Sequence, residues 1–326
     1  MAISSANHLK HNPLLTNLLI ERGFGEGSVA GVIAPRNNIG STKATYGKKD
    51  RQKSSAPVDT ERAPGAHTKT GKGRGHELVT EHLVDHSLKL PIPQEITEGM
   101  EEQEMLAERI STAEDIVNYI ENDWEEEVHE MAWASSAANF DAKFGTSQTL
   151  TPTTKWDAGT AKIKKDVMTG SDIMYKKSAK RPNLLVITRE VLNEIATADN
   201  EIRDSLKYTN EEGPAVTMRK LAGYFEIPQV VVPDWLEDVD NQESNPEKDF
   251  LWKGDHVGLY YINGQMGRRI TSFAKTFTTN FSESQFMETF SGFNRSNKSH
   301  EVEVSAYWHV AQIDKACAFF LTDLLS

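Results

Sequence analysis

A stretch of about thirty residues near the middle of the chain constrains the fold most, because its apolar residues recur every three or four positions. Seven of them form one stripe: Ala113, Ile116, Val117, Ile120, Trp124, Val128 and Met131. Ser111 and Glu114 fit a capping box, in which a hydroxyl and a carboxylate satisfy backbone donors at a helix start. The pattern predicts a helix that runs from there to about Phe140 and spans about 40 Å. We expect it to centre on residues 113 to 138 and to turn Trp124 and Met131 toward the core.

Charge is strongly segregated along the chain. Glu95 to Glu130 holds fourteen acidic residues and a single basic one, Arg109, which gives a net charge of −13. Residues 36 to 75 hold ten basic and three acidic residues, a net charge of +7. The two segments are therefore complementary, although the whole chain, at −12, has the wrong sign for a general nucleic-acid binder. The dense like charges on the predicted helix favour a basic partner.

The basic segment cannot build a core of its own. Ile39, Tyr46 and Val58 are its only large apolar residues, and Gly, Ser, Thr, Lys and Pro dominate the rest. A polar excursion of this length is unusual inside a compact domain. It is therefore either a disordered loop or a segment that docks on something outside its own subunit.

The first 35 residues have the texture of an arm. A short apolar stretch, Leu14 to Ile20, is followed by glycines at 23, 25, 27 and 31, which predict an extended, adaptable path. We find neither a signal peptide nor an apolar run of the roughly 18 residues that a membrane helix requires. We therefore expect synthesis in the cytoplasm and no membrane partner. The single Cys317 lies in an apolar run and is predicted to be a buried small hydrophobe.

The second half of the chain alternates between strand and helix patterns, and residues 76 to 93 are also strand-like. Helices are predicted at Arg189 to Ile195 and at Met218 to Phe225. Strands are predicted at Leu184 to Ile187, Val230 to Val232, Val257 to Ile262, Ile270 to Thr278 and Val302 to Trp308. We therefore expect a second, mixed α/β domain from residue 181 onward.

Candidate metal sites each lack a required element. His76-Glu77 begins like a zinc-protease helix, but position 80 is Thr where that motif needs a second His. His76, His82 and His86 share one face of a predicted strand, yet no Cys or spaced carboxylate pair supports a metal there. A third candidate is an acidic loop that contains Asp234, Glu237, Asp238, Asp240 and Glu243. It lacks the spacing and the central Gly of an EF-hand, and is interpreted as a solvated tip.

Candidate catalytic patterns are equally incomplete. Gly71 to Gly75 alternates glycine with basic residues but lacks P-loop spacing and its Gly-Lys-Ser/Thr ending. No Gly-x-Ser-x-Gly elbow is present, and the apolar run around Cys317 disfavours a thiolate. The sequence therefore predicts no catalytic residue, no metal ligand and no cofactor, and we do not expect an enzyme.

Five short motifs occur in order over most of the chain. They are Glu81 to Pro93, Trp156-Asp157, Arg181 to Ile187 (Arg-Pro-Asn-Leu-Leu-Val-Ile), Ile202 to Tyr208 (Ile-Arg-Asp-Ser-Leu-Lys-Tyr), and Leu221-Ala222 followed by Val230 to Val232. This series resembles the major capsid protein of tailed phages. Its first members look like the strand that leaves the family's extended loop and the Trp-Asp that follows its spine helix. The later ones look like the Pro-Asn-x-Leu-Val-Ile strand that enters the axial domain and the segments after it.

The resemblance implies an α+β chain in four parts. These are an N-terminal arm (1–35), an extended loop (36–90), a peripheral domain with a long spine helix (91–180), and an α/β axial domain (181–326). The last includes a return excursion through the peripheral domain near 275–310.

The resemblance also implies a structural role. Such a protein assembles with itself, as hexamers and pentamers, into the icosahedral shell that encloses the phage's double-stranded DNA without sequence-specific binding. Implied partners are a separate scaffolding protein and a portal protein, with a decoration protein as a further candidate. The implied location is the virion capsid, after synthesis in the cytoplasm of the bacterial host.

In that family the extended loop reaches over the peripheral domain of a neighbouring subunit. The resemblance therefore implies that the basic segment of one copy lies on the acidic region of the next. The candidate contacts are Lys48, Lys49, Arg51 and Lys53 on one side and Glu121, Glu125, Glu126 and Glu127 on the other.

Two alternatives stay open. An encapsulin-like protein compartment shares the fold and differs in cargo. A nucleic-acid-binding protein would use residues 36 to 75 as a basic arm, a reading weakened because Tyr46 is the only aromatic residue there for base stacking.

Overall fold

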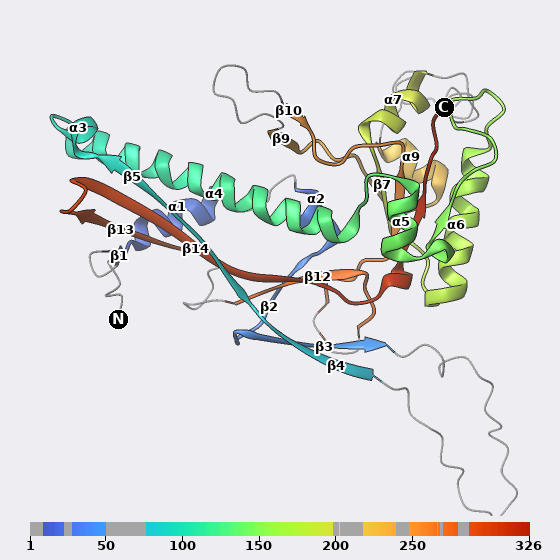
Figure 1. Ribbon diagram of the computed structural model, residues 1–326, viewed down its shortest axis with the longest axis horizontal. Coiled ribbons are helices and arrows are strands. Elements are labelled where there is room, and N and C mark those ends of the chain that lie inside the picture. The colour runs from blue at the N-terminus through green and yellow to red at the C-terminus, as the bar shows by residue number, and fades with distance from the viewer. Residues whose placement is uncertain are drawn as a thin grey trace, which may run out of the picture.

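One long helix and one long strand run side by side through much of the molecule (Figure 1). The computed structural model describes residues 9–22, 28–49, 76–197, 202, 218–238, 248–265, 267, 270–279 and 287–326. The helix is α4 (Glu102–Ala132) and the strand is β14 (Ser299–Gln312). Together with the sheet around β14 they form an elongated body, and a smaller α/β body lies at the other end.

β14 is the centre of a six-stranded sheet. It pairs with β13 (Met287–Asn294) and β12 (Ala274–Thr278) along one side and with β5 (Val84–Pro93) along the other. β1 (Lys10–His11) and β2 (Arg36–Asn38) complete the sheet. Segments from both ends of the chain therefore meet beside α4.

The second sheet has five strands in the order β6-β15-β11-β7-β8. These strands are β6 (Thr149–Leu150), β15 (Ala318–Leu321), β11 (Val257–Tyr260), β7 (Leu184–Ile187) and β8 (Gln229–Val231). Every residue of β7, β11 and β15 is buried, which explains their continuous apolar runs. Around the sheet lie α6 (Ile163–Ser178), α7 (Arg189–Thr197) and α9 (Met218–Phe225). The helices and strands predicted in this half are confirmed, with somewhat different ends.

The long helix exists where its apolar stripe predicts it, but both predicted ends are wrong. It begins nine residues before Ser111, at Glu102, and the capping box is made by Glu101 and Glu104. It ends at Ala132, because Trp133 adopts an extended backbone, and Ser136 then caps a separate helix, α5 (Ala137–Phe144). At 31 residues the helix spans about 46 Å at 1.5 Å per residue.

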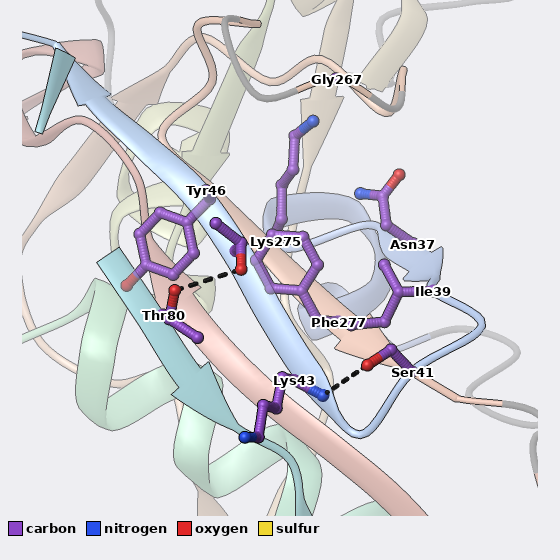
Figure 2. A pocket seen from close by; sticks show the side chains of 10 residues that line it. Asn37, Ile39, Ser41, Lys43, Tyr46, Thr80, Gly267, Lys275 and Phe277 are labelled. Carbon is purple, nitrogen blue, oxygen red and sulfur yellow. Dashed lines mark hydrogen bonds between the residues drawn. The ribbon is translucent and has the colours of Figure 1, made fainter. Parts of the chain in front are cut away.

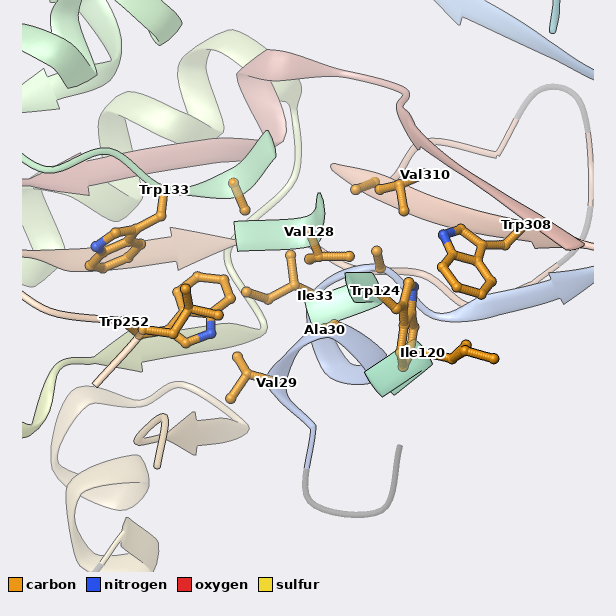
Figure 3. Close-up of a cluster of buried hydrophobic side chains, with 14 of the residues drawn as sticks. Val29, Ala30, Ile33, Ile120, Trp124, Val128, Trp133, Trp252, Trp308 and Val310 are labelled. Atoms are coloured by element: carbon orange, nitrogen blue, oxygen red, sulfur yellow. The ribbon is translucent and has the colours of Figure 1, made fainter. Parts of the chain in front are cut away.

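The stripe on α4 builds the larger core, as predicted. Figure 3 shows Trp124 and Val128 packed against the helix α2 (Val29–Ile33), with Trp252 and Trp308 nearby. Trp124 is buried, and Met131 is half-buried against the same cluster. Amphipathic packing therefore fixes the helix on the sheet.

The N-terminal segment is not extended throughout, contrary to the prediction. It contains α1 (Pro13–Arg22) and α2, and Ser28 caps α2 by accepting from the Gly31 amide. Gly31 lies inside α2, whereas the glycines at 23, 25 and 27 lie outside the described residues. Burial of Val29 and Ile33 under α4 explains why this segment is helical and docked.

The remaining elements are short. A hairpin of β3 (Lys43–Lys49) and β4 (His76–His82) leads away from the body (Figure 1). The others are α3 (Gln94–Thr97), the 3-10 turns η1 (Thr146–Gln148) and η2 (Lys315–Cys317), and the pair β9 (Leu236–Asp238) and β10 (Lys248–Phe250). No helix in the described part of the chain is long and apolar enough to cross a membrane.

Candidate functional site

The exposed face of α4 is acidic. Its exposed carboxylates include Glu114, Asp115, Asp123, Glu126 and Glu130. The only basic side chain of α4 apart from His129 is Arg109, which is half-buried and lies 3.0 Å from His300 Nδ1 on β14. Burial and the charge of Arg109 lower the pKa of His300. The face therefore carries crowded negative charge that α4 itself does not neutralise.

Glu125, a predicted contact with a neighbouring subunit, faces the opposite way. It is fully buried, and its carboxylate accepts hydrogen bonds from Ser28 Oγ, from the Ala30 amide at 3.1 Å and from Trp252 Nε1 at 2.8 Å. Burial raises the pKa of Glu125 although these donors oppose the shift. The carboxylate thus ties α4 to α2 and to the Trp252 segment, and it is not available to another copy.

Glu121 is also buried. Burial lowers the pKa of Arg36, and the charge of Glu121 opposes this shift in part. Glu121 therefore interacts within its own subunit, as Glu125 does. Of the four acidic candidates, Glu126 is exposed, and Glu127 is half-buried and accepts from Trp308 Nε1 at 2.7 Å. The sequence analysis grouped these four because they are close in sequence, although neighbouring residues of a helix point to different sides.

A groove beside the acidic face carries exposed apolar side chains. It lies between β5 and α4, has a volume of about 320 Å³, and includes Leu88 and Tyr119. His86 closes one side by stacking on Trp308, with 3.6 Å between ring centroids, and its Nδ1 lies 2.8 Å from Asp123. The groove thus combines apolar surface with the carboxylates of Asp85 and Asp123.

The strands β3 and β4 lie on the other side of the large sheet from α4 (Figure 1). Lys48 and Lys49 belong to β3, where their backbones pair with Glu77 and His76. Arg51 and Lys53 lie outside the described residues. The described part of the subunit therefore does not bring these lysines to the acidic candidates.

A second pocket, which the sequence analysis missed, lies at the base of the hairpin (Figure 2). It has a volume of about 460 Å³ and contains Lys43 and Lys275. Its other lining residues are Asn37, Ile39, Ser41, Thr45, Tyr46, Thr80, Gly267 and Phe277. The rings of Tyr46 and Phe277 stack with 5.6 Å between centroids, and Tyr46 Oη donates to Glu81 at 2.7 Å. We call this the hairpin pocket.

The patterns considered for metals do not converge in the described residues. No group of three or more His, Cys, Asp or Glu side chains there is placed to hold a metal ion. His86 faces Asp123, Asp234 pairs with Arg189, and Glu237 pairs with Lys253. Asp240, Glu243 and Gly71 to Gly75 lie outside the described residues. Cys317 is buried, as predicted.

Comparison with known proteins identifies the fold. The sequence matches no protein-family model and no curated protein. A phage-related protein from Bordetella bronchiseptica RB50 is similar in structure, with a TM-score of 0.68 and 16% identity over 97% of this chain and 98% of that one. The capsid structure of cyanophage P-SCSP1u is similar with a TM-score of 0.52 and 11% identity, over 92% of this chain and 89% of that one. A virus-like particle from Pyrococcus furiosus is similar with a TM-score of 0.51 and 12% identity, over 95% of this chain and 98% of that one.

The fold is therefore that of proteins that build shells. More specifically, it is the HK97-like fold of phage major capsid proteins. The resemblance inferred from the order of motifs and the α+β class are both confirmed.

Proposed function

We propose that this chain is the major capsid protein of a tailed phage, which assembles as hexamers and pentamers into the icosahedral shell around a double-stranded DNA genome. The observation that carries the proposal is the likeness in fold over 97% of the chain to a phage-related protein. A protein of this kind is made in the host cytoplasm and resides in the virion, with scaffolding and portal proteins as partners.

The surface of the subunit supports a role in assembly. The acidic face of α4 carries more negative charge than α4 itself neutralises, and the exposed apolar side chains of Leu88 and Tyr119 line one groove beside it. Exposed apolar side chains that lie together next to charged groups are typical of surfaces that a partner covers. In a shell that partner is a second copy of the chain.

The projecting hairpin supplies a matching contact. We propose that Lys48, Lys49, Arg51 and Lys53 of one copy lie near Glu126, Glu127 and neighbouring carboxylates of the next. Residues 36–49 of the basic segment are ordered within their own subunit through β2 and β3. The rest of the segment has too little apolar content to offset its ordering entropy by burial, so in this proposal contacts with another subunit supply the difference. Glu121 and Glu125 are no longer candidates, because both carboxylates are buried in their own subunit.

Electron microscopy tests the function. The protein is produced with its scaffolding partner and imaged after purification, and closed icosahedral shells are expected. A stable monomer under every assembly condition would contradict the proposal.

The contents of the shells separate the phage capsid from the encapsulin-like compartment, to which the virus-like particle from Pyrococcus furiosus gives some weight. Packaged, nuclease-protected DNA supports a phage capsid. Shells that enclose a protein cargo support the compartment.

A further inference from the structure

The hairpin pocket contains a buried cation without an acidic partner among the described residues. Lys275 on β12 is only 3% exposed. Its Nζ donates to the backbone oxygen of Gln265 at 2.5 Å, and no carboxylate in the described part of the chain forms an ion pair with it. Burial lowers the pKa of Lys275. An ammonium held by one neutral acceptor is costly to bury, because its charge has lost water and gained no counter-ion.

The chemistry of the hairpin pocket suits the end of an acidic side chain. Lys43, which is exposed, adds a second cation, and no Asp or Glu is among the described lining residues. The carboxylate of Glu81 nearby is already held by Tyr46 Oη at 2.7 Å and His309 Nε2 at 2.5 Å. Figure 2 shows the aromatic ring of Phe277 between the two lysines. A ligand with both a carboxylate and an apolar part would therefore satisfy the pocket.

The chain itself carries such a ligand at the far end of α4. Residues 95 to 106, which we call the acidic tip, include all of α3 but its first residue, and the first turn of α4. Its exposed carboxylates are Glu95, Glu98, Glu101, Glu102 and Glu104. The same segment exposes two apolar side chains, Ile96 at 51% and Leu106 at 37%. The tip thus offers negative charge and apolar contact together.

We propose that the acidic tip of a second copy of this chain occupies the hairpin pocket. A subunit cannot fill its own pocket, because α3 lies at one extremity of the molecule while β2, β3 and β12, which line the pocket, lie near its middle (Figure 1). The inference rests on the proposed function, since it requires copies of the chain side by side. A nucleic-acid phosphate also carries negative charge, but it has no apolar group to cover Ile39 and Phe277.

Replacing the buried lysine separates this role from a purely structural one. Lys275→Met keeps the length of the side chain and removes its charge. The unassembled variant should unfold about 2 °C or more above the parent, because the buried charge is gone. Its assembly should nevertheless weaken, with the critical concentration for shell formation raised about tenfold. Lys164→Met is a control. Lys164 lies on α6, away from the hairpin pocket, and is paired with Glu226, so its substitution should change neither quantity appreciably.

Exchanging the charges tests the occupant. Lys43→Glu alone and Glu98→Lys with Glu102→Lys alone should each weaken assembly, and the three changes combined should restore it. These glutamates are chosen because neither forms the capping box of α4. All assays are run without nucleic acid and repeated with DNA.

The inference is overturned if Lys275→Met assembles at the parental concentration, or if the combined variant fails to recover. It is also overturned if the effects appear only with DNA, which would assign the pocket to phosphate. In each of these cases shells of the parent protein still support the proposed function, whereas a parent that forms no shells would refute that function instead.

Discussion

Trp124→Ala tests the packing of α4 on the rest of the subunit. The Trp124 side chain is 1% exposed and lies over α2, where a Cβ at Gly31 would be 3.5 Å from the indole ring. Its Nε1 donates to Thr276 Oγ1 at 3.2 Å. The substitution removes the ring from a site bounded by α2, α4 and β12, and these elements cannot close over the space.

The expected loss is about 3 to 5 kcal/mol in the free energy of unfolding, as for other Trp-to-Ala changes in cores. The lost hydrogen bond contributes only about 1 kcal/mol of this, because Thr276 still donates to the Ala34 carbonyl oxygen at 2.9 Å. A loss of this size is a large fraction of the roughly 5 to 15 kcal/mol that stabilises an ordinary domain.

Urea unfolding of the unassembled subunit, followed by far-ultraviolet circular dichroism, measures the change. Circular dichroism is preferable to fluorescence because the variant lacks one of the six tryptophans. Tyr119→Ala is the matched control, since Tyr119 lies on the same helix but is 58% exposed. It should change the free energy of unfolding by less than about 0.5 kcal/mol. If Trp124→Ala costs less than about 1 kcal/mol at an unchanged denaturant slope, the stripe on α4 is not the packing face and the reasoning fails.

Three further predictions concern charge and packing. Burial raises the pKa of Glu125 in the folded state above its ordinary 4.5, so its contribution to stability is greatest below that value and is lost as pH rises through the folded pKa. The free energy of unfolding should therefore fall less steeply with rising pH in Glu125→Gln than in the parent. Urea titrations at pH values from below 4.5 upward measure this slope, and a slope equal to that of the parent would contradict the prediction. Reversing the four basic candidates, Lys48, Lys49, Arg51 and Lys53, to Glu should lower the assembly yield and change the salt dependence of shell dissociation. Each exposed pair contributes only about 0 to 1 kcal/mol, so the effect is a sum over pairs. The proposed docking of the basic segment fails if the reversed protein keeps the parental salt profile. Gly170→Ala should lower the free energy of unfolding by about 1 to 3 kcal/mol, because its new Cβ would lie 2.9 Å from the buried side chains of Leu259 and Phe319. Gly223→Ala is the control: with open space around it, it should raise the free energy of unfolding by about 0.5 to 1 kcal/mol. Thermal or urea unfolding measures both changes.

Local pattern was sufficient where one periodicity dominated. The stripe through Trp124 predicted the long helix, the apolar run at 184–187 predicted a buried strand, and residues 257–262 were predicted to form a strand. Burial on one or both faces leaves a regular mark in the sequence. α6 was missed, because its buried positions include Gly170 and Ser178 and its surface is rich in lysine. The ends of α4 were misplaced because Ser111 offered a plausible cap inside a helix whose first turn, at Glu102, is exposed and carries no apolar stripe.

The sequence by itself determined the class of fold, through the order of its motifs, and the opposite charges of its two segments. It did not determine which charged groups face outward. Glu125 and Glu126 are adjacent in sequence, yet one accepts three hydrogen bonds in the core and the other is exposed, because α2 and the Trp252 segment cover only one side of α4. Likewise, nothing near Lys275 in the sequence marks it as buried without an acidic partner. Its surroundings come from β2, β3 and β12, which are distant in sequence and adjoin only when the chain folds. Tertiary structure decided these environments because burial and pairing depend on contacts between distant segments, which local periodicity does not encode.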